Sequence, residues 1–143
     1  LAAAGSPNVH PHAVSDSVER AQWDRSMQRS GYDLLVLQTF FLDVLERRVS
    51  DPDSIRARAM EFFGVQGPWY TVGYRMAVTV ERAQGRDALL ASLCDAPRLL
   101  EAYNRSAPQD AELVLSDGRQ IRAVWSERLL QLLAGMPVTT SPR

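Results

Sequence analysis

The segment Gly67 to Leu93, GPWYTVGYRMAVTVERAQGRDALLASL, predicts the central helix of the fold. Pro68 has no backbone N–H to leave unpaired in a first turn, and its φ is already close to the helical value, so Gly67 and Pro68 define where the helix begins. Gly85 follows the apolar-periodic run and is expected to end the helix in a left-handed conformation. Gly73 lies inside the helix, where alanine would be favoured by about 1 kcal/mol, so we expect something to approach the backbone there.

Apolar residues recur at helical spacing on both sides of this segment and predict further helices. The expected helices cover residues 18–30, 32–50, 54–63, 70–84, 86–93, 97–106 and 125–134. Only the run from Gln109 to Ile121 alternates as a strand would, with a turn at 116–118. The fold class is therefore predicted to be all-α, an irregular bundle of about six to seven short and medium helices.

The length of 143 residues is that of one domain, which we place at residues 15–136. Residues 1–14 are small or polar residues with two prolines and no periodicity, and predict a flexible arm. Residues 137–143 predict a flexible tail. The chain does not begin with Met, so we expect a trimmed product, a remnant of the expressed sequence or the middle of a longer polypeptide.

Charge, hydropathy and cysteine content exclude several classes. A net charge of −1 and a pI near 6.1 do not provide the basic field that nucleic acid requires, so no nucleic-acid partner is expected. No apolar run approaches the roughly 18–20 residues of a membrane span. The single cysteine, Cys94, has no partner for an internal disulfide and is expected to be a small core residue.

The run from Gly67 to Ala107 resembles the C-terminal signature of a bacterial family of zinc-dependent peptidases, related by pattern to the gluzincins. The positions that carry the resemblance are Trp69, Tyr70, Gly73, Met76, Glu81, Gly85, Arg86, Leu89, Leu90, Tyr103 and Asn104. The resemblance implies a metallopeptidase, hence a hydrolase, with zinc as its cofactor and a peptide as its substrate. It also favours a location outside the cytoplasm.

The sequence departs from such peptidases at their metal-binding helix. It contains no H-E-x-x-H motif, in which two histidines one turn apart bind zinc and the glutamate polarises the bound water. The two histidines, His10 and His12, lie in the arm, and no third ligand is indicated beside them, so they are weak metal candidates. We therefore expect no catalytic residue and no zinc in this chain, with zinc held by the full-length parent through its missing N-terminal catalytic portion.

Two functional hypotheses follow. In the first, the chain is the C-terminal helical domain of a zinc-dependent peptidase, inactive alone, which forms part of the substrate cleft through Trp69, Tyr70, Tyr74 and Arg75. Tyr70 would then donate a hydrogen bond to the substrate carbonyl. In the second, it is a non-catalytic helical module that binds a partner or an apolar ligand through its aromatic surface.

The remaining residues of the segment are expected to serve structure: Gly67, Pro68, Gly73, Glu81, Gly85 and Arg86. Glu81 has arginines nearby at 82 and 86 and is predicted to pair with an arginine or with an uncapped backbone N–H. Periodicity alone leaves open whether Tyr70 lines a cleft or belongs to the core.

Overall fold

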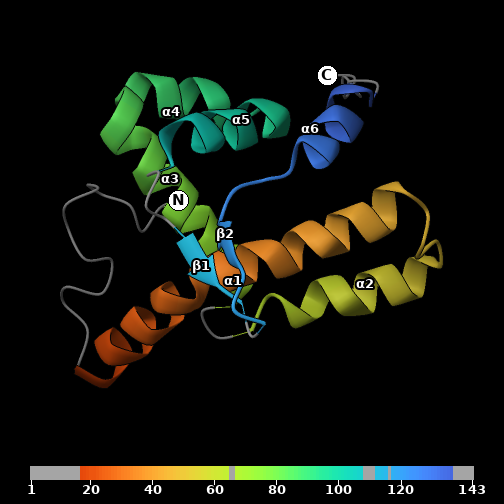
Figure 1. Cartoon of the computed structure of the whole chain (residues 1–143), viewed down its shortest axis with the longest axis horizontal. Helices are drawn as coiled ribbons and strands as arrows, with labels where there is room; N and C mark the ends of the chain where they lie inside the picture. The colour runs from red at the N-terminus through yellow and green to blue at the C-terminus, as the bar shows by residue number, and fades with distance from the viewer. Residues whose placement is uncertain (1–16, 65–66, 108–111, 116, 137–143) are drawn as a thin grey trace, which may run out of the picture.

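The computed structural model describes residues 17–64, 67–107, 112–115 and 117–136 of the 143-residue chain. Within these ranges the chain forms six helices and one short antiparallel hairpin (Figure 1). In order they are α1 (Ser17–Leu45), α2 (Pro52–Glu61), α3 (Pro68–Gln84), α4 (Arg86–Ser92), α5 (Ala96–Ser106), β1 (Glu112–Val114), β2 (Gln120–Arg122) and α6 (Glu127–Ala134). The predicted all-α class is confirmed, and the hairpin occupies the segment whose alternation favoured a strand. The expected arm and tail lie outside the described residues.

Helix α1 runs without a break through Gly31, where the sequence analysis expected one helix to end and another to begin. Gly31 is buried, and a Cβ added to it would lie 2.9 Å from Cδ2 of Leu113 in the hairpin. The missing side chain therefore admits the hairpin to the surface of α1. The expected boundary is wrong because glycine serves both as a helix end and as a point of close approach. The helix ends at Leu45, earlier than expected, and Arg47 after it has a φ of 57°.

The other helix starts follow from local chemistry. The side chains of Asp51, Asp95 and Ser126 each accept a hydrogen bond from a backbone N–H in the first turn of α2, α5 and α6. Such caps satisfy donors that have no partner inside the helix. Helix α3 begins as predicted, with Gly67 as its N-cap and Pro68 in its first turn.

The core lies where α3 crosses α1 and packs against α4 and α5 (Figure 1). Its most deeply buried side chains come from α1, α3, α5 and α6, and include Leu34, Leu37, Val80, Tyr103 and Leu129. Helix α2 lies antiparallel to the second half of α1 (Figure 1) and joins it through aromatic rings. Phe40 and Phe62 have ring centroids 5.3 Å apart, and Asp43 forms an ion pair with Arg58 at 3.0 Å.

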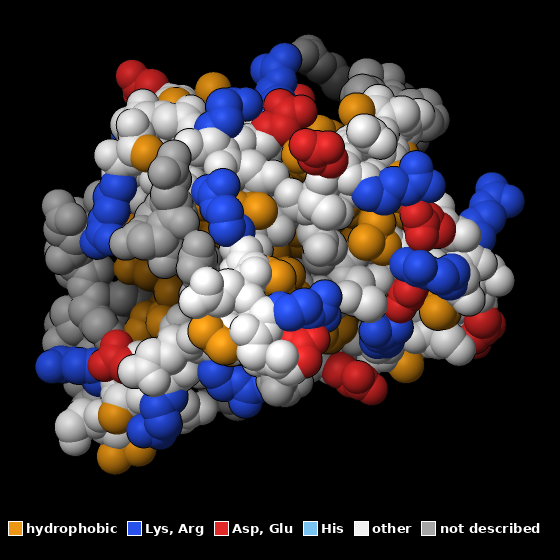
Figure 2. All heavy atoms as spheres, viewed as in Figure 1, with side chains coloured by type: hydrophobic (Ala, Val, Ile, Leu, Met, Phe, Trp, Pro, Cys, Tyr) orange, Lys and Arg blue, Asp and Glu red, His pale blue; other side chains and the backbone are white. Residues whose placement is uncertain are grey.

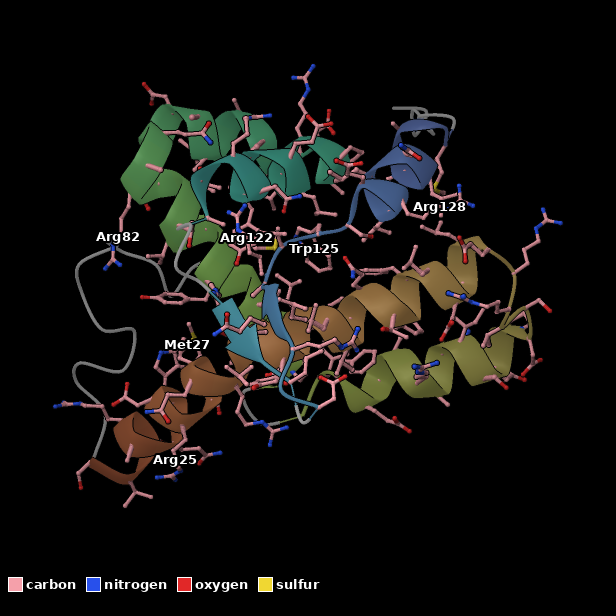
Figure 3. The ribbon with its side chains drawn as sticks, in the orientation of Figure 1. Arg25, Met27, Arg82, Arg122, Trp125 and Arg128 are labelled. Atoms are coloured by element: carbon pink, nitrogen blue, oxygen red, sulfur yellow. The ribbon has the colours of Figure 1, made fainter. Side chains whose placement is uncertain are left out.

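The hairpin and the segment after it are fastened to α5 by two adjacent polar side chains. The Tyr103 hydroxyl donates to the Ala123 carbonyl at 2.9 Å. Asn104 donates to the Trp125 carbonyl at 2.7 Å and accepts from the Trp125 N–H at 2.9 Å. Trp125 is thereby held between α1 and α5 (Figure 3). The Tyr-Asn pair that ends the family-like signature thus binds the C-terminal part of the chain to the bundle.

Two surface properties bear on the expectations. Cys94 is exposed in the turn after α4, so its expected place in the core is wrong. The apolar spacing of α4 stops before it, and the turn faces outward.

Arginines and acidic side chains are interspersed over the face shown in Figure 2, without an extended patch of one sign. In the described ranges, no helix combines the length and hydropathy of a membrane span.

Candidate functional site

The four predicted cleft residues all lie on helix α3, and their side chains contact different neighbours. Trp69 is partly buried in an aromatic cluster, with its ring centroid 5.6 Å from that of Phe62 and 5.7 Å from that of Phe41. Its indole N–H donates to the Ala59 carbonyl at 2.9 Å. Trp69 therefore joins α2 to α3 and packs against the core.

Tyr70 lies at the exposed edge of this cluster: it is 53% exposed, and Phe63, whose ring lies 6.1 Å from that of Trp69, connects the two. The Tyr70 ring lies 6.3 Å from that of Phe63, which is 46% exposed. Met60, one turn before Phe63, is 60% exposed. We call Met60, Phe63 and Tyr70 the aromatic surface. Large apolar side chains gathered at one corner of a protein are typical of a binding surface.

Tyr74 packs edge-on against Trp23 of α1, with ring centroids 5.2 Å apart. Burial raises the pKa of Tyr74, and the charge of Arg82 opposes that rise. Tyr74 thus lies with the first half of α1, away from Phe63. The structure does not bring Tyr70 and Tyr74 into one cluster, although their spacing places both on one side of α3.

Arg75 points to another side of α3, toward α1 and α5. Its Nη1 donates to Ser30 Oγ at 3.1 Å, and the Ser30 side chain is almost wholly buried. Burial raises the pKa of Tyr103, while the Arg75 guanidinium and, more weakly, Arg122 act in the opposite direction. Arg75 therefore lies close to the hydroxyl that fastens the hairpin.

The glycines of the segment differ in what surrounds them. A Cβ on Gly67 would overlap the Phe62 carbonyl oxygen, so this position requires glycine. A Cβ on Gly73 would meet no described atom within 4 Å. The expected close neighbour at Gly73 is therefore not found in the described part of the protein. Gly85 has a φ of 87° and a ψ of 167°, a conformation that only glycine adopts readily, so the expected positive φ is present but the conformation is not the left-handed helical one.

Glu81 forms an ion pair with Arg86 across the junction of α3 and α4, with Nη1 and Oε1 2.9 Å apart. The Glu81 side chain is 8% exposed, whereas Arg86 is 56% exposed. The second carboxylate oxygen of Glu81 is buried with no hydrogen-bond partner in the described residues. Arg86 is thus the partner that Glu81 takes of the two arginines the sequence offered.

The described residues do not fit a zinc site. Among them no group of three or more His, Cys, Asp or Glu side chains lies close enough to hold a metal ion. His10 and His12, the weak metal candidates, lie outside the described residues. One oxygen of the buried carboxylate, Glu81, is already bound by Arg86. No catalytic step through zinc can be built from these side chains.

Comparison with family models matches residues 7–112 to the family described as "Putative zinc dependent peptidase (DUF5700)". The chain belongs to this family. The match spans α1 to α5 and therefore includes the aromatic surface, Arg75 and the Tyr103–Asn104 pair. No curated protein and no solved structure matches the chain. The resemblance drawn from the sequence is confirmed, and the family description names zinc as the metal and peptide hydrolysis as the activity.

The sequence analysis missed several residues that the structure places beside the predicted ones. Phe63 and Met60 extend the surface of Tyr70, and their separation by one turn just before Gly67 was a usable signal. Ser30 and Arg122 approach Arg75 and Tyr103 from distant parts of the chain, and no local pattern could have identified them.

Proposed function

We propose that this chain is the C-terminal helical domain of a zinc-dependent peptidase, that it forms part of the wall of the substrate cleft, and that it is inactive alone. Membership of the family over residues 7–112 is the observation that carries the proposal. The chain has two histidines and one cysteine, and no H-E-x-x-H motif. The zinc ligands would therefore come from outside these 143 residues.

The aromatic surface supports a role in holding a peptide. Tyr70 and Phe63 present rings to solvent beside Met60, and Tyr and Met are favoured at binding surfaces. Within the described residues the Tyr70 hydroxyl has no hydrogen-bond partner, so it could donate to a peptide carbonyl. Gly73 lies one turn after Tyr70, with open space where a side chain would be. A peptide backbone could approach α3 there without displacing anything described.

The runner-up is a non-catalytic helical module that uses the same aromatic surface to bind a protein partner or an apolar ligand. Its support is that the described residues contain the surface but no metal-ligating group. The two proposals differ in what the surface prefers. A peptidase domain should bind short unstructured peptides, whereas an interaction module should not.

Two measurements test the proposal. After washing with chelator and redialysis against zinc, the 143-residue chain should retain no stoichiometric metal and should hydrolyse no fluorogenic peptide. Titration with an apolar, N-acetylated tripeptide should show binding that Tyr70→Ala weakens roughly tenfold, since loss of one ring contact and hydrogen bond costs about 1.4 kcal/mol. Leu90→Ala is the matched control because Leu90 is also 53% exposed but lies on α4.

Tightly held zinc with chelator-sensitive turnover would overturn the inactive-alone part of the proposal. Equal peptide affinity in the Tyr70→Ala, Leu90→Ala and unaltered proteins would remove the aromatic surface from the cleft. No peptide binding at all would favour the interaction module.

A further inference from the structure

In the described part of the chain, the partners of Arg75 are neutral hydroxyl groups. Arg75 donates to the hydroxyl of Ser30 at 3.1 Å and lies near the hydroxyl of Tyr103, which itself donates to the Ala123 carbonyl. Its Nη1 lies 3.2 Å from the position that a Cβ on Gly31 would take, and Cδ2 of Leu113 lies 2.9 Å from the same position, so the guanidinium and the hairpin meet over Gly31. Arg75 is partly buried, and within the described ranges it forms no ion pair.

A second guanidinium reaches the same region from the hairpin. Arg122 lies on the side of the hairpin that faces α5 (Figure 3), and its Nη2 donates to the Ala107 carbonyl at 3.3 Å. Like Arg75, Arg122 lowers the pKa of Tyr103 against the effect of burial. Arg122 precedes Ala123, whose carbonyl accepts a hydrogen bond from the Tyr103 hydroxyl, so both positive charges lie in the neighbourhood of this buried tyrosine. In the sheet register Arg122 stands opposite Glu112, so the inference depends first on Arg75.

Seven of the arginines that the structure describes form ion pairs with Asp or Glu, and Arg75 is not among them. They are Arg48, Arg58, Arg86, Arg98, Arg105, Arg119 and Arg128. A partly buried charge that lacks a counterion is unfavourable, and a second charge of the same sign nearby makes it more so. An anion bound between the two guanidiniums would relieve both costs, and a carboxylate matches the planar fork of arginine.

We propose that Arg75, assisted by Arg122, binds a carboxylate, and that this carboxylate is the C-terminal end of a bound peptide. The identity of the ligand rests on the proposed function, because a peptidase domain is the reason to expect a peptide. The site takes the charge of the peptide end, whereas the aromatic surface takes apolar side chains. The protein would then prefer peptides with a free C-terminus.

The test compares one peptide in two forms, N-acetyl-Ala-Ala-Phe as the free acid and as the C-terminal amide, by calorimetry at low salt. The acid should bind roughly tenfold tighter than the amide. Arg75→Gln and Arg122→Gln should each reduce that ratio toward one. Arg119→Gln should leave the ratio unchanged, because Arg119 lies on the same hairpin but is paired with Asp117 at 2.7 Å. Circular dichroism of each variant reports whether it folds, and Arg122→Gln keeps the test available if Arg75→Gln does not.

A direct readout on the unaltered protein is the NMR signal of the Arg75 side-chain Nε–Hε, which should shift with the acid and stay in place with the amide. Equal binding of acid and amide would overturn the carboxylate site, and if Tyr70→Ala still weakened both, the proposed function would stand. Binding of neither form would remove both proposals. Inorganic phosphate that displaced the acid at a lower concentration than the acid's own Kd would also overturn the assignment to a peptide end.

Discussion

Replacement of Gly73 by alanine should stabilise the protein, which is unusual for a residue inside a signature segment. Gly73 lies within α3, and a Cβ at this position would meet no described atom within 4 Å. A glycine inside a helix costs about 0.5–1 kcal/mol relative to alanine, and nothing described here offsets that cost. For a chain of this size the gain corresponds to a rise in Tm of about 2–3 °C.

Gly67→Ala is the contrasting variant on the same helix. A Cβ at Gly67 would overlap the carbonyl oxygen of Phe62 and lie 3.0 Å from the backbone nitrogen of Gly64. Both obstacles are backbone atoms, which cannot rotate aside as a side chain could. Overpacking of this kind costs about 1–3 kcal/mol, so Tm should fall by about 3–9 °C.

Urea unfolding followed by circular dichroism, with the two variants and the unaltered protein measured together, gives the free energies directly. Destabilisation of Gly73→Ala by 1 kcal/mol or more would show that the open space is filled, and the reasoning would fail. If Gly73→Ala is more stable but binds the tripeptide more weakly, the glycine serves the ligand. Stability and binding would then have opposite requirements at one position, as is common at functional sites.

Four further changes test the energetics of the fold. Burial raises the pKa of Asp33 above 3.8, so the folded protein favours the protonated carboxyl and loses stability as the pH rises through the folded-state pKa. Asp33→Asn, which keeps the side chain neutral, should therefore raise Tm at neutral pH and not below pH 3.8. Hydrogen bonds from Ser54 lower the pKa of Asp51, so the ionised carboxylate stabilises the folded protein above pH 3.8, and this stabilisation is lost as the pH falls through the folded-state pKa. Asp51→Ala should therefore lower Tm at neutral pH and have a smaller effect in acid. Gly85→Ala should cost about 1–3 kcal/mol in urea unfolding because the φ of 87° becomes strained, and an unchanged free energy would contradict this. Tyr103→Phe should lower the free energy of unfolding by about 1–3 kcal/mol, because the buried Ala123 carbonyl loses its hydrogen-bond donor. A decrease below about 0.5 kcal/mol, roughly the lower limit for one hydrogen bond, would mean that this bond contributes little.

Much of the fold could be predicted because its boundaries are set by local chemistry. Gly67 with Pro68 begins a helix in the structure as it does in the sequence analysis, and Asp51 with Pro52 begins α2 by similar local chemistry. The role of Gly31 could not be predicted in this way, because the residue that needs the missing side chain is Leu113, more than eighty positions further along the chain. A contact of that separation leaves no periodic signal in a single sequence.

The site was predicted less well than the fold because neighbours on a helix need not share a surface. Tyr74 and Arg75 are consecutive, yet one packs against Trp23 and the other reaches Ser30. Successive residues on a helix point about 100° apart, so α3, which is buried on several sides, distributes the four candidates among different neighbours. Only Tyr70 emerges largely exposed.

The signature residues can be divided by whether a contact within the chain accounts for them. Tyr103 and Asn104 hold the hairpin segment, and Glu81 pairs with Arg86, so a fold requirement explains these positions. Tyr70 has an exposed ring, and the open space at Gly73 has no described occupant. Positions whose chemistry the fold does not use are the ones to vary when binding is tested. Variants at Tyr103 or Glu81 would alter stability and binding together. Tyr70→Ala and Gly73→Ala should instead change binding without loss of the fold. Whether binding changes while the fold is kept therefore decides whether α3 only supports the fold or also forms a binding surface.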